Sequence, residues 1–245
     1  MTWTPYSKII CILLITNALL IGYSVLDVEL EVFGLELKKG KYIKQKYNIL
    51  KTKDLIDSIE AIKDTVIKEK TLDTSSQKIL LTGDSMSEGI YWWFRHYCKH
   101  NNHEIKTVPW FSSATIGWAG SDSLRKLIAK HKPTYVILCL GSNELFIRNV
   151  EDREPAIQGI ISQVDSVPFV WVGPPNWKED TGLNDLIMNN LGEKQFFLSK
   201  HFKLPRRKDG AHPTTEGYLT WTDTLCKWLE HSCEHPIKMQ KPTNL

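Results

Sequence analysis

From residue 77 onward, short apolar runs alternate with longer amphipathic stretches, and this alternation limits the fold more than any other feature of the chain. Residues 78–82 (KILLT) and 135–140 (YVILCL) are almost wholly apolar, as expected for strands that are buried on both faces. Shorter runs predict three more strands, at residues 104–109, 169–172 and 196–198. The stretches between them predict helices over residues 88–99, 121–131, 155–167 and 214–231.

Strands that alternate with helices in this way form a mostly parallel sheet with helices on both faces. In such sheets the functional groups collect at the carboxyl ends of the strands. A chain of 245 residues is long enough for one such domain with additional segments. We therefore expect one domain over residues 77–235, a short tail over residues 236–245, and functional residues directly after the strands.

An uncharged, mostly apolar segment at residues 9–26 is just long enough to span a bilayer. Lys8 precedes it and acidic residues follow it from Asp27 onward, which favours an amino terminus inside and the rest of the chain outside. We expect residues 1–26 to form a signal anchor, with a cleaved signal peptide as the alternative. Both place the domain outside the cytoplasm, in the periplasm or at the cell surface, and cleavage would make it secreted.

Residues 27–76 are rich in charged residues and contain no proline, so they predict a polar, partly helical stem. Within this stem, isoleucine and leucine recur between charges over residues 47–70, as in an amphipathic helix. Such a helix either stays solvated or associates with a second copy, and the sequence leaves both alternatives open.

The balance of charged residues argues against nucleic-acid binding. The chain has 31 Lys and Arg residues against 28 Asp and Glu, a formal net charge of +3, which does not support nucleic-acid binding. The basic residues Lys203, Arg206, Arg207 and Lys208 are expected to form a solvated surface patch.

The five cysteines form no CxxC pair and have no zinc-type spacing with histidine, so we expect no metal and no cofactor. In a domain outside the cytoplasm, a disulfide could join two of Cys98, Cys226 and Cys233. The sequence does not choose the pair.

Two polar motifs directly follow predicted strands. Gly83-Asp84-Ser85 comes after the first strand, so the Ser85 hydroxyl lies at a strand-to-helix turn, beside backbone N–H groups that a helix start leaves unpaired. Gly141-Ser142-Asn143-Glu144 follows the strand at residues 135–140, and the Asn143 amide can donate to a developing oxyanion. Taken singly, Ser85 and Asn143 are also ordinary cap or turn residues.

A third motif, Asp209-Gly210-Ala211-His212, precedes the last predicted helix. The Asp209 carboxylate can hold the His212 imidazole in one tautomer and stabilise its protonated form. A serine hydroxyl needs such a base within hydrogen-bond reach to act as a nucleophile at neutral pH. These residues therefore predict a Ser85, His212 and Asp209 triad.

In chain order, the motifs resemble the blocks of the SGNH/GDSL hydrolase family, which read GDS, Gly, GxND and DxxH. Here the single glycine of the second block is matched by Gly117. The resemblance covers residues 78–229 and implies the flavodoxin-like fold of that family. That fold is a three-layer α/β/α sandwich around a parallel sheet of roughly five strands.

By this resemblance Ser85 is the nucleophile, His212 the base and Asp209 its orienting partner. The backbone N–H groups of Ser85 and Gly117 and the Asn143 side chain would form the oxyanion hole. We prefer Gly117 to the nearby Gly120 because counting back from the apolar helix pattern at Leu124 places Gly117 at the tip of a loop.

The chain departs from the family pattern at two positions. Met86 replaces the usual leucine after the serine, a tolerated change because the two side chains have similar volumes. Glu144 replaces the usual aspartate after the asparagine, which puts the geometry of that loop in doubt. A GxSxG elbow is absent, so the ordinary α/β-hydrolase fold is disfavoured.

Nine tryptophans are many for a chain of this length. Three of them, Trp110, Trp118 and Trp177, fall in predicted loops near the edge of the sheet that carries the motifs. There an aromatic face can stack on a sugar ring. Each of the three is equally well explained as a packing anchor. Together with export, they predict removal of short acyl groups, O-acetyl above all, from a carbohydrate. Acyl transfer, lipase or thioesterase action, a silent glycan-binding scaffold, and metal-dependent hydrolysis through Asp84, Asp209 and His212 are the alternatives.

Overall fold

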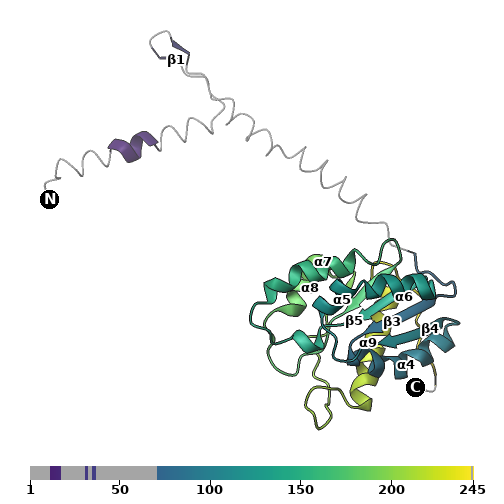
Figure 1. The fold of residues 1–245 in the computed structure, drawn as a ribbon. Helices are drawn as coiled ribbons and strands as arrows, with labels where there is room; N and C mark the ends of the chain where they lie inside the picture. Colours follow the sequence, from purple (N-terminus) through teal and green to yellow (C-terminus); the bar gives the residue numbers. More distant parts are fainter. Residues whose placement is uncertain (1–11, 18–30, 33–34, 37–70, 244) are drawn as a thin grey trace. The chain divides into compact units, whose positions relative to one another are not determined.

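The computed structural model describes residues 12–17, 31–32, 35–36, 71–243 and 245 (Figure 1). The chain divides into two units, Met1–Glu69 and Lys70–Leu245. In the first unit, residues 12–17 are helical. Strands β1 (Glu31–Val32) and β2 (Leu35–Glu36) pair antiparallel.

Most of the predicted membrane segment, and the whole of the predicted stem helix at residues 47–70, lie outside the described residues. Within the described ranges, no helix combines the length and the apolar character needed to cross a bilayer. The signal anchor and the self-association of the stem therefore stay predictions.

The second unit is built on a five-stranded sheet in which every neighbouring pair is parallel. Its spatial order is β4-β3-β5-β6-β7. Strand β4 therefore forms one edge beside β3, and β5, β6 and β7 follow in order on the other side of β3. This confirms the predicted five-stranded parallel sheet. The strands are β3 (Lys78–Gly83), β4 (Glu104–Pro109), β5 (Tyr135–Cys139), β6 (Phe169–Val172) and β7 (Phe196–Phe197).

Helices cover both faces of the sheet (Figure 1). On one face lie α4 (Ser85–His100) and α9 (Thr215–His231), which contact each other. The other face carries α5 (Thr115–Ser121), α6 (Ser123–His131), α7 (Glu154–Ile161) and α8 (Leu183–Leu191). The second unit has the three layers that the alternating sequence pattern predicts.

The central strands explain why the core forms on both faces. Along β3, Leu80 packs against the face covered by α5 and α7, and its neighbour Leu81 packs against the face covered by α4 and α9. In β5, Leu138 and Ile137 divide in the same way. Because successive side chains of a strand point to opposite faces, a continuous apolar run supplies both cores at once.

Three features differ from the sequence-based expectation. Helix α8 was not predicted, because it is only nine residues long and is rich in Asn and Asp, which are weak helix formers. The predicted helix at residues 121–131 is preceded by a separate helix, α5, and Asp122 joins α5 to α6 in the left-handed conformation at φ 54°. Within residues 236–245, expected as a tail, Ile237 and Met239 are buried in the core.

The cysteines of the second unit lie inside the core. Cys98, Cys139 and Cys226 are buried free thiols. Cys233 is also buried, and its Sγ donates to the Leu229 carbonyl at 3.2 Å. Burial raises the pKa of the Cys139 and Cys226 thiols, which keeps them protonated and unreactive.

Gly83, the last residue of β3, lies at φ +136°, and a Cβ there would be 1.8 Å from the Cys139 carbonyl oxygen in the neighbouring strand. We expect Gly83→Ala to prevent stable folding, because both the backbone conformation and the space require glycine. Gly120→Ala is the matched control, since a Cβ at Gly120 meets nothing within 4 Å. Circular dichroism and thermal melting of the two variants make the test, and a folded Gly83→Ala protein with wild-type stability would contradict it.

Candidate active site

Ser85, His212 and Asp209 form a continuous hydrogen-bonded chain. The Ser85 Oγ lies 3.0 Å from His212 Nε2, and His212 Nδ1 lies 2.9 Å from Asp209 Oδ2. Although Ser85 and His212 are 127 positions apart in sequence, the fold brings them within hydrogen-bond reach. The predicted triad therefore has the geometry of a serine nucleophile, a base and an orienting carboxylate.

Ser85 owes its position to the junction of β3 and α4. Asp84 is the N-cap of α4 and Ser85 is its first residue, so the amide of Ser85 is among those that the helix itself leaves without a carbonyl partner. The side chain of Ser85 is partly exposed at this edge. The hydroxyl can thus face the carbon of a substrate carbonyl group while the amide faces its oxygen.

The loop before α9 holds the other two residues in place. Asp209 Oδ1 accepts hydrogen bonds from the amides of Ala211 and His212, both at 2.9 Å, while Oδ2 contacts the imidazole. These amide hydrogen bonds, followed by the imidazole contact, lower the pKa of Asp209 to about 2. The carboxylate is therefore ionised throughout the pH range in which a histidine base works.

The buried carboxylate of Asp84 joins the two loops that carry Ser85 and Asn143. Its oxygens accept four hydrogen bonds, from the Met86 amide and from the Gly141 amide, the Ser142 amide and the Ser142 hydroxyl. Burial raises the pKa of Asp84, and the hydrogen bonds act in the opposite direction. Asp84 is thus a positioning residue, and among the described residues it forms no metal-binding cluster with Asp209 and His212.

Asn143 lies at the exposed carboxyl end of β5, as the sequence predicts. Its Nδ2 donates to the Ser113 carbonyl at 2.9 Å. This contact orients the amide and leaves the second hydrogen of Nδ2 for a developing oxyanion.

Glu144, which replaces the usual aspartate, is fixed by several contacts in the loop after β5. Its carboxylate is buried, accepts from the Thr115 amide at 2.6 Å and the Thr115 hydroxyl at 3.0 Å, and forms an ion pair with Arg153 at 2.6 Å. The longer side chain therefore reaches across to the start of α5. The loop after β5 is held firmly against the segment that precedes α5.

Gly117 does not lie at a loop tip, and this part of the prediction is wrong. It is the third residue of α5, because the helix begins at Thr115, well before the pattern around Leu124 from which the position was counted. A Cβ at Gly117 would meet the Trp110 ring at 3.4 Å. Its part in the oxyanion hole still rests on the resemblance alone, since the segment that Asn143 contacts is at Ser113.

The three predicted sugar-binding tryptophans have different environments. Trp118 is 1% exposed, lies in α5 and donates from Nε1 to Ser113 Oγ, so it is a core residue and cannot stack on a sugar. Trp110 is 41% exposed and packs on Trp118 with ring centroids 5.4 Å apart. Trp177 is partly buried and lines a cavity after β6.

Arg206 has a structural role that sequence reasoning missed. Its guanidinium donates to the Ala211 carbonyl in the loop before α9 that carries Asp209 and His212, which we call the triad loop. It also donates to the Pro175 and Asn176 carbonyls, at 3.2 and 3.0 Å, in the loop after β6. Arg206 therefore does not belong to the solvated surface patch that the sequence predicts. Instead, its hydrogen bonds link two loops. Its place in a run of basic residues hid this role.

No cluster of three or more His, Cys, Asp or Glu residues suited to a metal ion occurs among the described residues. The chemistry that the site supports by itself is nucleophilic attack by Ser85 with His212 as the base.

Asp84→Asn tests the positioning role of the buried carboxylate. An asparagine would turn its own N–H groups toward donors or leave them unpaired, so we expect the free energy of unfolding to fall by about 2–3 kcal/mol. Urea denaturation measures the change. The control is Asp152→Asn, at an exposed position, which should change stability by less than about 0.5 kcal/mol; equal stability of both variants would refute the role.

Asp209 should make the stability of the fold depend on acidic pH. Its pKa falls from an ordinary 3.8 to about 2 on folding, so its carboxylate stabilises the fold above pH 4 and this contribution disappears as the pH drops toward 2. The difference in melting temperature between wild type and Asp209→Asn should therefore be constant at higher pH and shrink between pH 4 and pH 2. A difference that persists unchanged at pH 2 would show that the charge is not responsible.

The chain is similar to several solved structures of ester hydrolases. The second unit is similar to the crystal structure of a lipase/acylhydrolase from Enterococcus faecalis, with a TM-score of 0.52 and 17% identity over 68% of this chain and 100% of that chain. A psychrotrophic esterase from Pseudoalteromonas sp. matches with a TM-score of 0.47 and 15% identity over 62% and 98%. A lipolytic protein of the G-D-S-L family from Desulfitobacterium hafniense matches at 0.44 and 16% over 60% and 97%.

No family model and no curated protein matches the sequence. The comparison that carries weight is the one with the Enterococcus protein, which extends over the whole length of that protein. Residues 71–245 therefore have a fold similar to that of this lipase/acylhydrolase, a parallel sheet with helices on both faces, which is the fold that the resemblance of the four sequence blocks implies.

Proposed function

We propose that this protein is a serine esterase that removes short acyl groups, O-acetyl above all, from a carbohydrate outside the cytoplasm. The observation that carries the proposal is the hydrogen-bonded chain from Ser85 through His212 to Asp209. A binding protein needs no activated hydroxyl, so this arrangement favours catalysis over a silent scaffold.

In the first half-reaction, Ser85 Oγ attacks the ester carbonyl carbon while His212 Nε2 takes the hydroxyl proton. The carbonyl oxygen becomes an oxyanion, which the Ser85 amide and the Asn143 side chain stabilise; one such donor is typically worth about 3–4 kcal/mol. The tetrahedral adduct collapses as His212 returns the proton to the sugar oxygen. The sugar alcohol leaves and the acyl group stays on Ser85.

In the second half-reaction, water attacks the acyl-enzyme and His212 takes its proton. The carboxylic acid leaves and the proton returns to Ser85 Oγ. Throughout, the ionised Asp209 holds the imidazole in the tautomer with hydrogen on Nδ1 and stabilises its charged form. An acceptor alcohol in place of water would make the same site an acyltransferase.

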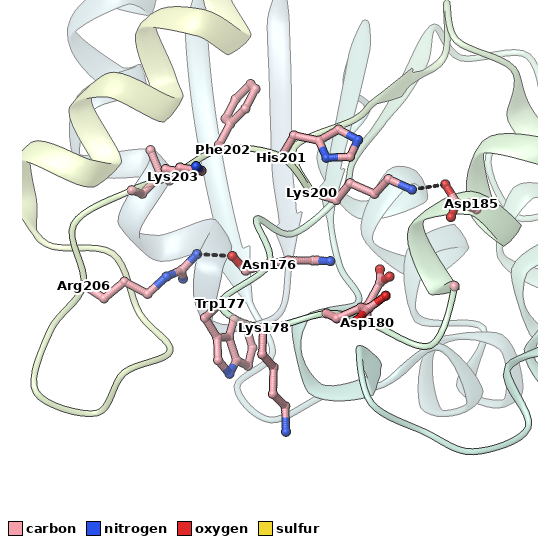
Figure 2. Close-up of a pocket in the computed structure, with 13 residues that line it drawn as sticks. Asn176, Trp177, Lys178, Asp180, Asp185, Lys200, His201, Phe202, Lys203 and Arg206 are labelled. Carbon is pink, nitrogen blue, oxygen red and sulfur yellow. Dashed lines mark hydrogen bonds and ion pairs between the residues drawn. The ribbon is translucent and has the colours of Figure 1, made fainter.

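The cavity beside Trp177 supports a carbohydrate substrate (Figure 2). It has a volume of about 700 Å³ and lies between the loops that follow β6 and β7. Asn176, Asp180 and Lys200 offer hydrogen-bonding groups there, and Arg206 connects this wall to the triad loop. Polar groups around an aromatic ring suit a polyhydroxylated ligand.

One observation favours a longer acyl chain as a second candidate. Trp110, Phe111 and Ile116 are exposed apolar side chains in the segment after β4, at 41%, 55% and 54%. An apolar cavity of about 260 Å³ lies beside Trp110 and Trp118. These surfaces could contact the acyl chain of a lipid-like ester rather than a sugar.

Hydrolysis of 4-nitrophenyl acetate and 4-nitrophenyl octanoate by the full chain separates the candidates. We expect turnover of the acetate ester in preference to the octanoate, loss of activity by about a thousandfold or more in Ser85→Ala, and no effect of a chelator. Ser166→Ala, at an exposed serine outside the site, should behave as wild type.

The same variants should be tested on an acetylated polysaccharide, with released acetate as the measurement. Preference for octanoate would favour the second candidate. Activity that survives Ser85→Ala would refute the serine mechanism.

A further inference from the structure

A second cavity lies on the other side of the triad loop, between α4 and the start of α9. Its volume is about 300 Å³, and its walls include Trp92 and Arg95 from α4 and Arg207 from the triad loop. Gly89 and Tyr218 contribute where the two helices approach most closely, since a Cβ at Gly89 would strike the Tyr218 ring. None of the residues that line this cavity is acidic.

The two arginines of the cavity are held by aromatic rings and have no carboxylate partner among the described residues. The Arg95 guanidinium carbon lies 4.5 Å from the Trp92 ring centroid, and that of Arg207 lies 5.9 Å from the Tyr218 ring centroid. Arg95 Nε is buried and has no hydrogen-bond partner. A guanidinium group near an aromatic face is attracted to it, and its N–H groups can still bind an oxyanion.

Two features connect this cavity to the catalytic residues: one turn of α4 and one backbone hydrogen bond. Gly89 follows Ser85 by four positions on α4, about one helical turn. The Arg207 amide donates to the His212 carbonyl at 2.8 Å. A group bound in this cavity therefore lies close to an ester held at Ser85.

Arg206 and Arg207 are consecutive, yet they line different cavities. Arg206 faces the polar cavity beside Trp177, which Figure 2 shows, and Arg207 faces the cavity at α4. The triad loop thus separates two binding cavities. This arrangement suits a chain-like substrate that extends to both sides of the scissile ester.

We propose that the cavity lined by Arg95 and Arg207 binds a negatively charged group, a carboxylate or a sulfate, on a sugar of the polysaccharide that carries the ester. This inference rests on the proposed function and narrows its substrate class to acidic polysaccharides. Guanidinium groups pair with such oxyanions through parallel hydrogen bonds. The 53% exposed ring of Trp92 supplies a face for the sugar itself.

Binding of charged and neutral oligosaccharides to the full chain tests the site. Isothermal titration calorimetry should show binding of tetragalacturonate and of a sulfated carrageenan tetrasaccharide, and much weaker binding of neutral maltotetraose. Arg95→Gln should raise the dissociation constant for the charged ligands by about tenfold, the loss of one charge-assisted hydrogen bond. Added salt should weaken the binding to wild type.

Lys99→Gln is the matched control, because Lys99 is an exposed basic residue of the same helix that does not line the cavity. It should bind the charged ligands as wild type does. Should Arg95→Gln melt well below wild type, Arg207→Gln, at an exposed position, replaces it in the binding test. Equal binding of charged and neutral ligands, or equal losses in the Lys99 and Arg95 variants, would overturn the proposal.

A parallel assay with 4-nitrophenyl acetate distinguishes failure of this site from failure of the proposed function. That ester carries no charged sugar, so its hydrolysis by wild type and its loss in Ser85→Ala report on the esterase alone. Binding of tetragalacturonate through Arg95 without any Ser85-dependent hydrolysis would refute the esterase and leave the anion site standing. Hydrolysis without selective binding of charged ligands would do the reverse.

Discussion

The active edge of this protein depends on the buried carboxylate of Asp84. One of its oxygens accepts from the first turn of α4, and the other accepts three donors of the Gly141–Ser142 segment, so it connects the ends of β3 and β5. The Asp84 amide adds a hydrogen bond to the Cys139 carbonyl at 2.9 Å. Ser85 and Asn143 directly follow these tied segments. This buried hydrogen-bond network therefore sets the distance between the nucleophile and the oxyanion donor.

Two further networks extend this rigidity to the neighbouring loops. Glu144 ties the loop after β5 to Thr115 at the start of α5 and to Arg153. Arg206 ties the triad loop to the carbonyls of the loop after β6. Loops are usually the mobile parts of such folds, and fixing them with buried charged groups keeps catalytic atoms in register. His212 and Asp209 can then stay accessible to substrate without losing their alignment.

The proposed carbohydrate substrate rests on the two cavities beside the triad loop. A polar cavity with Trp177 lies on one side of the triad loop, and a cationic cavity with Trp92 lies on the other. Both combine an aromatic ring with charged groups, which suits sugars and their acidic derivatives better than long acyl chains. The exposed apolar residues after β4 support the second candidate, an ester with a longer acyl chain.

The sequence alone determined the parallel sheet, its five strands and the triad, because apolar runs mark buried strands and each motif directly follows one of them or opens the last helix. Local pattern could not place Gly117 or Trp118, since both depend on a helix that begins at Thr115, where the Glu144 carboxylate accepts the amide. Nor could it show that Arg206 is a tie and that Arg207 enters a cavity, although both lie in one basic run. Those roles come from contacts between residues far apart in the chain, which only the tertiary structure creates.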